Sequence, residues 1–338
     1  MIELHNVNFH YTGGTNAGGL TDINLTIPDG QVILFCGQSG CGKTTLTRLV
    51  NGLIPNYYEG DLSGEVLLNG ENISTLPLYQ TAKYVGSVFQ NPRTQFFTID
   101  TTSELAFGSE NQGLPEADIV QRIYATTECF SVKKLLGKNI FQLSGGEKQK
   151  IACASVSVTD PQVIVLDEPS SNLDITATKD LRGMIEIWKS QGKTIIVAEH
   201  RLYYLADLID RAVYLQDGRI AADFSGQEMK LLSSEKLKEM GLRSFELSQY
   251  PIKHVRPLDN EVITLSDFYF AYQKDKAALH IPSLVLPKHS VIALIGHNGA
   301  GKSTLARCLC GLESIAVGLF LLQENSIIEK GGCAIVTW

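Results

Sequence analysis

The sequence has no apolar run that approaches the roughly 20 residues needed to cross a bilayer, and it has no block of like charge. Its formal net charge of −7 leaves no basic excess, which disfavours a nucleic-acid-binding protein. Its seven cysteines form no Cys-x-x-Cys pair and no zinc spacing. Their odd number predicts reduced thiols in a cytosolic protein. We therefore expect any role at a membrane to require a partner.

The sequence does contain a phosphate-binding pattern, Gly-x-x-x-x-Gly-Lys-Ser/Thr, in two copies. The glycines let backbone N–H groups curl around phosphate oxygens, the lysine reaches the terminal phosphates, and the hydroxyl residue reaches Mg²⁺. The predicted helix after each loop directs its positive end at the same anion. The first copy comprises Gly37, Gln38, Ser39, Gly40, Cys41, Gly42, Lys43, Thr44 and Thr45, and the second includes Gly296, Gly299, Gly301, Lys302, Ser303 and Thr304.

An acidic pair follows a predicted buried strand, VIVLDEP at 163–169. The carboxyl end of such a strand lies beside the phosphate loop in an open parallel sheet. Asp167 is therefore expected to hold Mg²⁺ together with Thr44, and Glu168 to polarise the attacking water.

The repeat extends beyond the phosphate loops. IELHNVNFHY at 2–11 matches ITLSDFYFAY at 263–272, and residues 29–53 match residues 288–312 in spacing. Each copy predicts two strands, a glycine loop and a helix. We assign residues 1–225 to a complete first domain, 226–258 to a helix and linker, and 259–338 to the N-terminal part of a second domain.

The stretch LSGGE at 143–147 carries a family resemblance, because it resembles the signature of ATP-binding-cassette (ABC) proteins. The resemblance implies an α/β P-loop NTPase fold with a RecA-like parallel sheet, an antiparallel β subdomain and a helical signature subdomain. It also implies that Ser144, Gly145 and Gly146 close over ATP held by an opposing ABC domain, in a homodimer or with a paralogous subunit.

Four further positions resemble family motifs. Gln90 resembles the glutamine that contacts the metal and the attacking water, and Asp174 resembles the aspartate that faces across the dimer. His200 resembles the switch histidine at the γ-phosphate, and Tyr11 the aromatic residue that stacks on adenine, with Tyr272 as its counterpart in the second unit. The implied cofactors are ATP and Mg²⁺.

The segment VFQNPRTQFFTIDTTSELAFGSENQGLP at 88–115 resembles ATPase subunits of energy-coupling-factor and cobalt-type importers, which take vitamins or metal ions into prokaryotic cells. The resemblance implies transmembrane transporter subunits as partners, no nucleic acid, and a peripheral location on the cytoplasmic face of the membrane. Phe96 and Phe97 are candidates either for the groove that receives a membrane subunit's helix or for ordinary core.

Alternatives remain open in the sequence. A chromosome-maintenance ATPase would insert a long coiled coil, for which residues 45–140 are too short. A translation-associated tandem ATPase would carry a highly charged linker and a basic surface, which this sequence does not show. A non-catalytic nucleotide-binding fragment is the third alternative.

After Leu312 we find no sequence match to the first repeat. We therefore expect the residues from about Ile315 onward to be a frameshifted reading of a longer gene. The second unit then lacks a counterpart of the signature, acidic strand and switch histidine. Hydrolysis by this chain would require two first units from separate chains, or another ATPase subunit.

Overall fold

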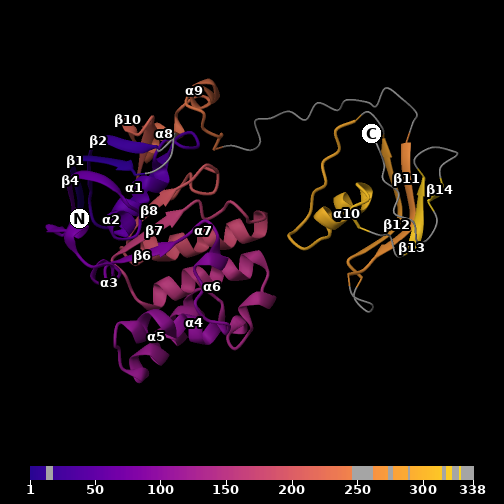
Figure 1. Ribbon diagram of the computed structural model, residues 1–338, viewed down its shortest axis with the longest axis horizontal. Coiled ribbons are helices and arrows are strands. Elements are labelled where there is room, and N and C mark those ends of the chain that lie inside the picture. The colour runs from indigo at the N-terminus through magenta and orange to yellow at the C-terminus, as the bar shows by residue number, and fades with distance from the viewer. Residues whose placement is uncertain are drawn as a thin grey trace. The chain divides into compact units, whose positions relative to one another are not determined.

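The computed structural model describes residues 1–12, 18–245, 262–272, 277–287, 290–313, 317–321 and 327–328. The chain divides into two compact units, Met1–Gln249 and Tyr250–Trp338. Figure 1 shows the first unit as a sheet-rich part with a group of helices, α4, α5 and α6, at one side of it.

The centre of the first unit is a six-stranded sheet in the order β10-β9-β3-β8-β7-β6. Its strands are β3 (Val32–Cys36), β6 (Val85–Val88), β7 (Val163–Asp167), β8 (Thr194–Ala198), β9 (Arg211–Gln216) and β10 (Arg219–Ser225). All neighbouring pairs are parallel except β9–β10. Successive β3 residues face opposite sides, so Leu34 packs in one core cluster and Phe35 in the other. The apolar runs at 32–36 and 194–198 are buried on both faces, as a covered parallel sheet requires.

A second sheet in this unit is antiparallel and has the order β2-β1-β4-β5. It consists of β1 (Ile2–Tyr11), β2 (Gly19–Ile27), β4 (Gly60–Leu68) and β5 (Glu71–Asn72). Alternating apolar residues of β1, among them Leu4 and Phe9, are buried in the core cluster that contains Phe35. This sheet therefore covers one face of the central sheet.

The helices of the first unit cover the sheet and form the signature subdomain. They are α1 (Lys43–Val50), α2 (Leu53–Asn56), α3 (Leu78–Thr81), α4 (Thr101–Asn111), α5 (Glu116–Cys129), α6 (Gly145–Val158) and α7 (Ile175–Ser190). Short 3-10 turns lie at Ile73–Thr75, Pro92–Thr94, Lys133–Leu135 and Ile140–Gln142. The mixed α/β fold with a parallel core, antiparallel strands and a helical subdomain confirms the predicted fold class.

The first unit extends beyond residue 225, where the sequence placed the end of the domain. Helices α8 (Gly226–Lys230) and α9 (Ser234–Glu239) follow β10 directly. Met229 of α8 and Leu237 of α9 are buried in the same core cluster as Leu34. These two helices thus belong to the first compact unit because their apolar side chains complete its core.

The second unit contains β11 (Val262–Phe270), β12 (Leu279–Pro287), β13 (Val317–Leu321), β14 (Ile327–Ile328) and α10 (Lys302–Leu309). Their sheet has the order β12-β11-β13-β14. Leu265 of β11 pairs with Phe320 of β13, as Leu4 of β1 pairs with Val66 of β4. Residues 317–321 of the tail therefore pair with β11 in the position that β4 takes beside β1, although we find no sequence match between the two segments.

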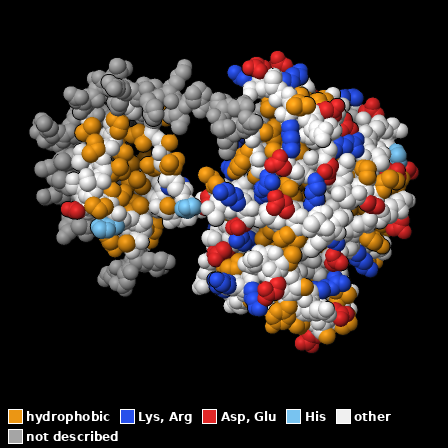
Figure 2. All heavy atoms as spheres, turned by 180° about the vertical axis from the view of Figure 1, so that it is seen from behind, with side chains coloured by type: hydrophobic (Ala, Val, Ile, Leu, Met, Phe, Trp, Pro, Cys, Tyr) orange, Lys and Arg blue, Asp and Glu red, His pale blue; other side chains and the backbone are white. Residues whose placement is uncertain are grey.

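The strand predicted just before the second phosphate loop is not formed. Residues 291–297 are described without regular structure, and Val291 and Ile295 are 105% and 90% exposed. In the first unit the equivalent strand, β3, is held between β8 and β9. Within the described residues, the second unit has no strand beside residues 291–295, so this segment lacks the sheet neighbours that β3 has. In the view of Figure 2, hydrophobic side chains gather on the visible face of the second unit.

Candidate functional site

The first phosphate loop joins β3 to α1 and has the geometry of an anion cradle. Gly42, at the helix N-cap, has a φ of 108°, a conformation that side chains disfavour. A Cβ at Gly37 would lie 2.3 Å from the carbonyl oxygen of Leu215, so no larger residue fits there. Lys43 is buried, and its Nζ donates to the carbonyl oxygens of Gly37 and Gln38 at 3.0 and 2.9 Å. The loop thus holds a cation and the N-terminus of α1 at one place, which suits a polyphosphate.

The predicted magnesium ligands are adjacent. Thr44 Oγ1 donates to Asp167 Oδ1 at 3.1 Å, which joins the start of α1 to the end of β7. Burial raises the pKa of Asp167, and the neighbouring Glu168 adds to the rise, while the hydrogen bond from Thr44 opposes it. A hydroxyl and a carboxylate are the oxygen ligands that Mg²⁺ uses alongside nucleotide phosphates. This donor set fits the implied ion.

The three predicted catalytic residues meet at the end of β7. Gln90 Nε2 donates to Glu168 Oε2 at 2.9 Å, and His200 Nε2 lies 3.1 Å from Glu168 Oε1. Glu168 has a φ of 45°, in the left-handed region that non-glycine residues seldom occupy. Its N–H donates to the carbonyl oxygen of Ala198 on β8 at 2.8 Å. The backbone is therefore held so that this carboxylate faces both neighbours.

Tyr11 lies next to the first phosphate loop, and its role in stacking on adenine stays a prediction. Its hydroxyl is 3.2 Å from Thr45 Oγ1 and accepts from Arg48 Nη1 at 2.9 Å. The Arg48 guanidinium also lies 3.8 Å from the centre of the Tyr58 ring, a cation–π contact. The sequence did not single out Arg48 or Tyr58. Their positions within the helix and the following loop carry no motif, and only the folded contacts identify them.

The signature residues form the N-terminus of α6. Ser144 is the helix N-cap, and with Glu147 it forms a capping box in which each side chain bonds the other residue's backbone N–H. Ser144 Oγ also donates to Glu147 Oε2 at 2.8 Å. A Cβ at Gly146 would lie 2.8 Å from the Ala177 side chain, so the glycine permits close packing on α7. Asp174 caps α7 by accepting from Ala177 N at 2.9 Å. The contact of these residues with an opposing domain remains a prediction.

Two charged residues that the sequence did not select, Glu199 and Arg201, flank His200. Glu199 is 2% exposed and accepts hydrogen bonds from the backbone N–H groups of His200 and Arg201 at 2.8 and 3.0 Å. A buried carboxylate at the end of an apolar strand is a signal that could have identified it. The sequence analysis selected His200 instead, because His200 matches a family motif and Glu199 does not.

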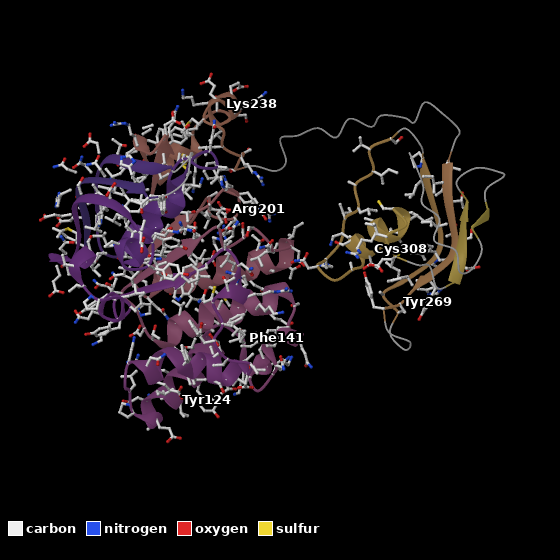
Figure 3. All side chains as sticks on the ribbon, in the orientation of Figure 1. Tyr124, Phe141, Arg201, Lys238, Tyr269 and Cys308 are labelled. Atoms are coloured by element: carbon white, nitrogen blue, oxygen red, sulfur yellow. The ribbon has the colours of Figure 1, made fainter. Side chains whose placement is uncertain are left out.

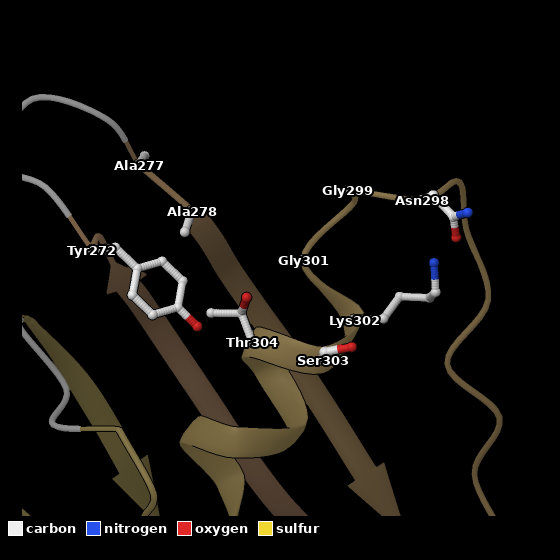
Figure 4. Close-up of a pocket in the computed structure, with 9 residues that line it drawn as sticks. All are labelled: Tyr272, Ala277, Ala278, Asn298, Gly299, Gly301, Lys302, Ser303 and Thr304. Atoms are coloured by element: carbon white, nitrogen blue, oxygen red, sulfur yellow. The ribbon is translucent and has the colours of Figure 1, made fainter. Parts of the chain in front are cut away.

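The second phosphate loop forms a pocket of about 560 Å³. Lys302 Nζ donates to the carbonyl oxygens of Gly296 and His297 at 2.8 and 2.7 Å, as Lys43 does in the first loop. Figure 4 shows Tyr272 and Thr304 pointing toward one another across the pocket. Its lining comprises Tyr272, Ala277, Ala278, Asn298, Gly299, Gly301, Lys302, Ser303 and Thr304. The lysine of the second phosphate loop thus bonds the same two loop carbonyl groups as its counterpart in the first unit.

The two phenylalanines after Gln90 have different surroundings. Phe96 packs partly buried against the core, whereas Phe97 is 76% exposed and stacks on Phe107 with ring centres 4.9 Å apart. Ile99 is exposed nearby in sequence. Phe97 therefore remains a candidate for a partner surface, and Phe96 is core. No helix within the described residues has the length and apolar character needed to span a bilayer.

Comparison with known proteins gives a consistent result. Residues 20–171 and 279–334 match the family model described as ABC transporter. The chain is 45% identical over 336 residues to an ABC transporter ATP-binding protein of Treponema denticola, an alignment that covers 98% of this chain and 68% of that protein. It spans about two thirds of the length of the curated relatives it matches. The second matched stretch covers residues 279–334 and so includes most of the tail.

Two solved structures resemble the chain. One is cbiO1 of Clostridium perfringens, part of the ABC transporter complex cbiONQ, with a TM-score of 0.60 and 29% identity over 68% of this chain and 89% of that one. The other is the dimeric ATP-binding cassette MJ0796 bound to ADP and Pi, with a TM-score of 0.58 and 22% identity over 67% of this chain and 98% of that one. The latter similarity supports the fold.

Proposed function

The chain belongs to the ABC transporter family of ATPases, and from that premise we propose that it is the ATP-hydrolysing subunit of a membrane importer of the vitamin or metal-ion class. The observation that carries the hydrolytic part is the meeting of Gln90, Glu168 and His200 beside the first phosphate loop. The importer class is supported by the segment at 88–115 and by the similarity to cbiO1.

ATP would bind with its phosphates in the cradle of Lys43 and its base against the Tyr11 ring. Thr44 and Asp167 would hold Mg²⁺, with Gln90 Oε1 as a further oxygen ligand, and the ion would neutralise the phosphate charge. Glu168 would orient and polarise the attacking water, and His200 would contact the γ-phosphate from the neighbouring strand end. These residues come from β1, the start of α1, the end of β7 and the segments that follow β6, β7 and β8, so the fold itself brings the reacting groups together.

We further propose that two ABC domains must associate for turnover. Ser144, Gly145 and Gly146 offer a hydroxyl and backbone N–H groups at the start of a fourteen-residue helix, which is an anion site suited to a second nucleotide. The opposing domain would come from a homodimer or a paralogous subunit. A test is sedimentation of the Glu168→Gln chain with and without ATP and Mg²⁺. An ATP-dependent dimer that Ser144→Arg abolishes supports the proposal, whereas a monomer under all conditions contradicts it.

The transporter partners would occupy a surface that includes the exposed Phe97, at the cytoplasmic face of a prokaryotic membrane. The test is copurification of the chain with the membrane proteins encoded beside its gene. Phe97→Asp is expected to abolish that association and leave ATP binding unchanged, because the ring makes no contact with the phosphate loop in the described contacts. Retention of the Phe97→Asp chain by the membrane proteins would exclude this surface.

The second unit would bind a nucleotide at Lys302 without residues of its own for hydrolysis. The pocket with Tyr272 and the phosphate loop supports this assignment. Lys302→Ala is expected to remove one of two bound nucleotides in equilibrium dialysis, and Lys43→Ala the other. A stoichiometry that Lys302→Ala leaves unchanged would show that the second loop does not bind.

A further inference from the structure

The two residues that flank the switch histidine contact the loop after Glu168, residues 170–174. Arg201 Nη1 donates to the carbonyl oxygens of Ser170 and Leu173, each at 3.1 Å, and Nη2 donates to that of Ser171 at 3.4 Å. Figure 3 labels Arg201 in the first unit. One guanidinium thus satisfies three carbonyl groups of a loop that has no regular structure of its own.

Glu199 contacts the same loop from within the core. Its Oε2 accepts from Ser170 N at 3.3 Å and from the Tyr204 hydroxyl at 2.9 Å. Its Oε1 accepts from the N–H groups of His200 and Arg201. One buried carboxylate therefore bonds both the loop and the backbone of His200. A carboxylate at this depth is held by charge-assisted hydrogen bonds, and each lost partner leaves a buried polar group unsatisfied.

We propose that Glu199 and Arg201 are positioning residues that hold His200 and the 170–174 loop as one unit, so that His200 stays in contact with Glu168 during hydrolysis. The inference deepens the proposed ATPase function and rests on it. Neither residue is within the described contacts of the phosphate loop, so each would act through His200 and Glu168. Ser171 Oγ also donates to the carbonyl oxygen of Gln90 at 3.5 Å, which extends the unit to the third residue that contacts Glu168.

The substitutions Arg201→Met and Glu199→Gln separate the contacts. Arg201→Met removes all three bonds to loop carbonyls and keeps the apolar stem of the side chain. Glu199→Gln keeps the shape, but its amide can satisfy the N–H groups of His200 and Arg201 only by turning its NH₂ toward Tyr204 and Ser170 N. The N–H of Ser170 then loses its acceptor, so the loop is released while His200 N stays bonded.

The matched control is Arg182→Met. Arg182 Nη1 also donates to a backbone carbonyl oxygen, that of Tyr204 at 2.9 Å, but it does not contact the 170–174 loop in the described contacts. In the full chain with ATP and Mg²⁺, Arg201→Met is expected to lower kcat about tenfold with KM within about twofold of wild type. Arg182→Met is expected to change neither value by more than about twofold. The double variant Glu199→Gln, Arg201→Met is expected to be no slower than Arg201→Met alone, because Glu199 and Arg201 hold the same loop and histidine.

If the wild-type chain is active, an unchanged kcat in both Arg201→Met and Glu199→Gln would overturn the inference and leave the proposed function standing. Equal losses of kcat and ATP affinity in Arg201→Met and Arg182→Met would show general damage to the fold and overturn it too. A wild-type chain without turnover, both alone and together with a paralogous ABC subunit, would refute the proposed function and this inference together. If Arg201→Met does not fold, the isosteric Glu199→Gln decides alone, with lowered kcat and unchanged KM supporting the inference and wild-type kcat refuting it.

Discussion

His200 Nε2 lies 3.1 Å from Glu168 Oε1, although 31 residues lie between them in the sequence. β7 and β8 are parallel neighbours, and Glu168 follows directly after β7 while His200 lies two residues after the end of β8. The parallel pairing of the two strands thus explains why the two side chains lie close together. It places Glu168, predicted to polarise the attacking water, beside His200, predicted to contact the γ-phosphate. The same carboxylate accepts from Gln90 through its other oxygen.

Tyr11 is expected to contribute to ATP affinity mainly through its ring. Stacking of a base on an aromatic side chain is worth about 1 to 3 kcal/mol, so Tyr11→Ala should weaken ATP binding by about tenfold or more. Tyr11→Phe loses only the hydroxyl bonds to Arg48 and Thr45 and should stay within about threefold of wild type. Calorimetric titration of each variant with ATP and with inorganic triphosphate measures these affinities. A loss in Tyr11→Ala that is as large for triphosphate as for ATP would exclude base stacking.

Cys41 is expected to react slowly with thiol reagents and to block nucleotide binding once modified. It is 6% exposed, and its Sγ lies 3.7 Å from Lys43 Nζ inside the loop. An added group there would displace the lysine. Cys129 and Cys310 are exposed and should be labelled first without loss of binding. The measurement is ATP affinity after timed labelling by a maleimide, with ATP expected to protect Cys41. Inhibition of the same extent in Cys41→Ala would assign the effect to another cysteine.

Glu147 is expected to stabilise the chain through its charged form. Hydrogen bonds from the backbone N–H and hydroxyl of Ser144 lower the pKa of Glu147 below its ordinary value of 4.5. Its contribution is therefore fully present above pH 4.5 and is lost as the pH falls through the lowered value. Glu147→Gln keeps a side chain that can close the capping box but removes the negative charge at the N-terminus of α6, so it should reduce the free energy of unfolding by about 0.3 to 1 kcal/mol at neutral pH.

Urea unfolding of wild type and Glu147→Gln, followed from neutral pH down to about pH 4, measures this difference. The two stabilities should converge as the carboxyl group becomes protonated. Glu128→Gln is a suitable control, because that carboxylate is exposed in an ion pair with Lys133. A Glu147→Gln difference that stays constant with pH would show that the carboxylate charge has no part in the cap.

The sequence predicted the fold class and the residues of the first site because phosphate loops, signature and strand-end carboxylates are local patterns. Those patterns set backbone conformation and polarity within a few residues. Contacts made by long side chains across elements could not be read in the same way. Arg48 reaches both Tyr11 and Tyr58, and Arg201 reaches three carbonyl groups, through distances that only the folded backbone fixes.

The second unit shows the opposite limit. Its loop sequence predicted a strand at 291–295, yet strand formation needs neighbours as well as apolar residues. Ile295 is exposed, whereas its first-unit counterpart Cys36 is fully buried between two paired strands. The tail follows a related pattern, because β13 pairs with β11 in the position in which β4 pairs with β1, although we find no sequence match between the two segments. The register of strand pairing depends on the paired backbone and is only weakly specified by the sequence of either strand.

The measurement that tests the account most directly is ATP turnover and ATP affinity of Glu168→Gln beside wild type, in the presence of Mg²⁺. The substitution removes the charge that polarises water and leaves Thr44, Asp167 and the phosphate loop intact. We predict that turnover falls by about a hundredfold or more while ATP affinity stays within about threefold. Glu186→Gln, in an exposed ion pair with Arg182, should keep wild-type turnover. A Glu168→Gln chain that hydrolyses ATP within about twofold of the wild-type rate would contradict the assignment of Glu168 and the catalytic site built around it.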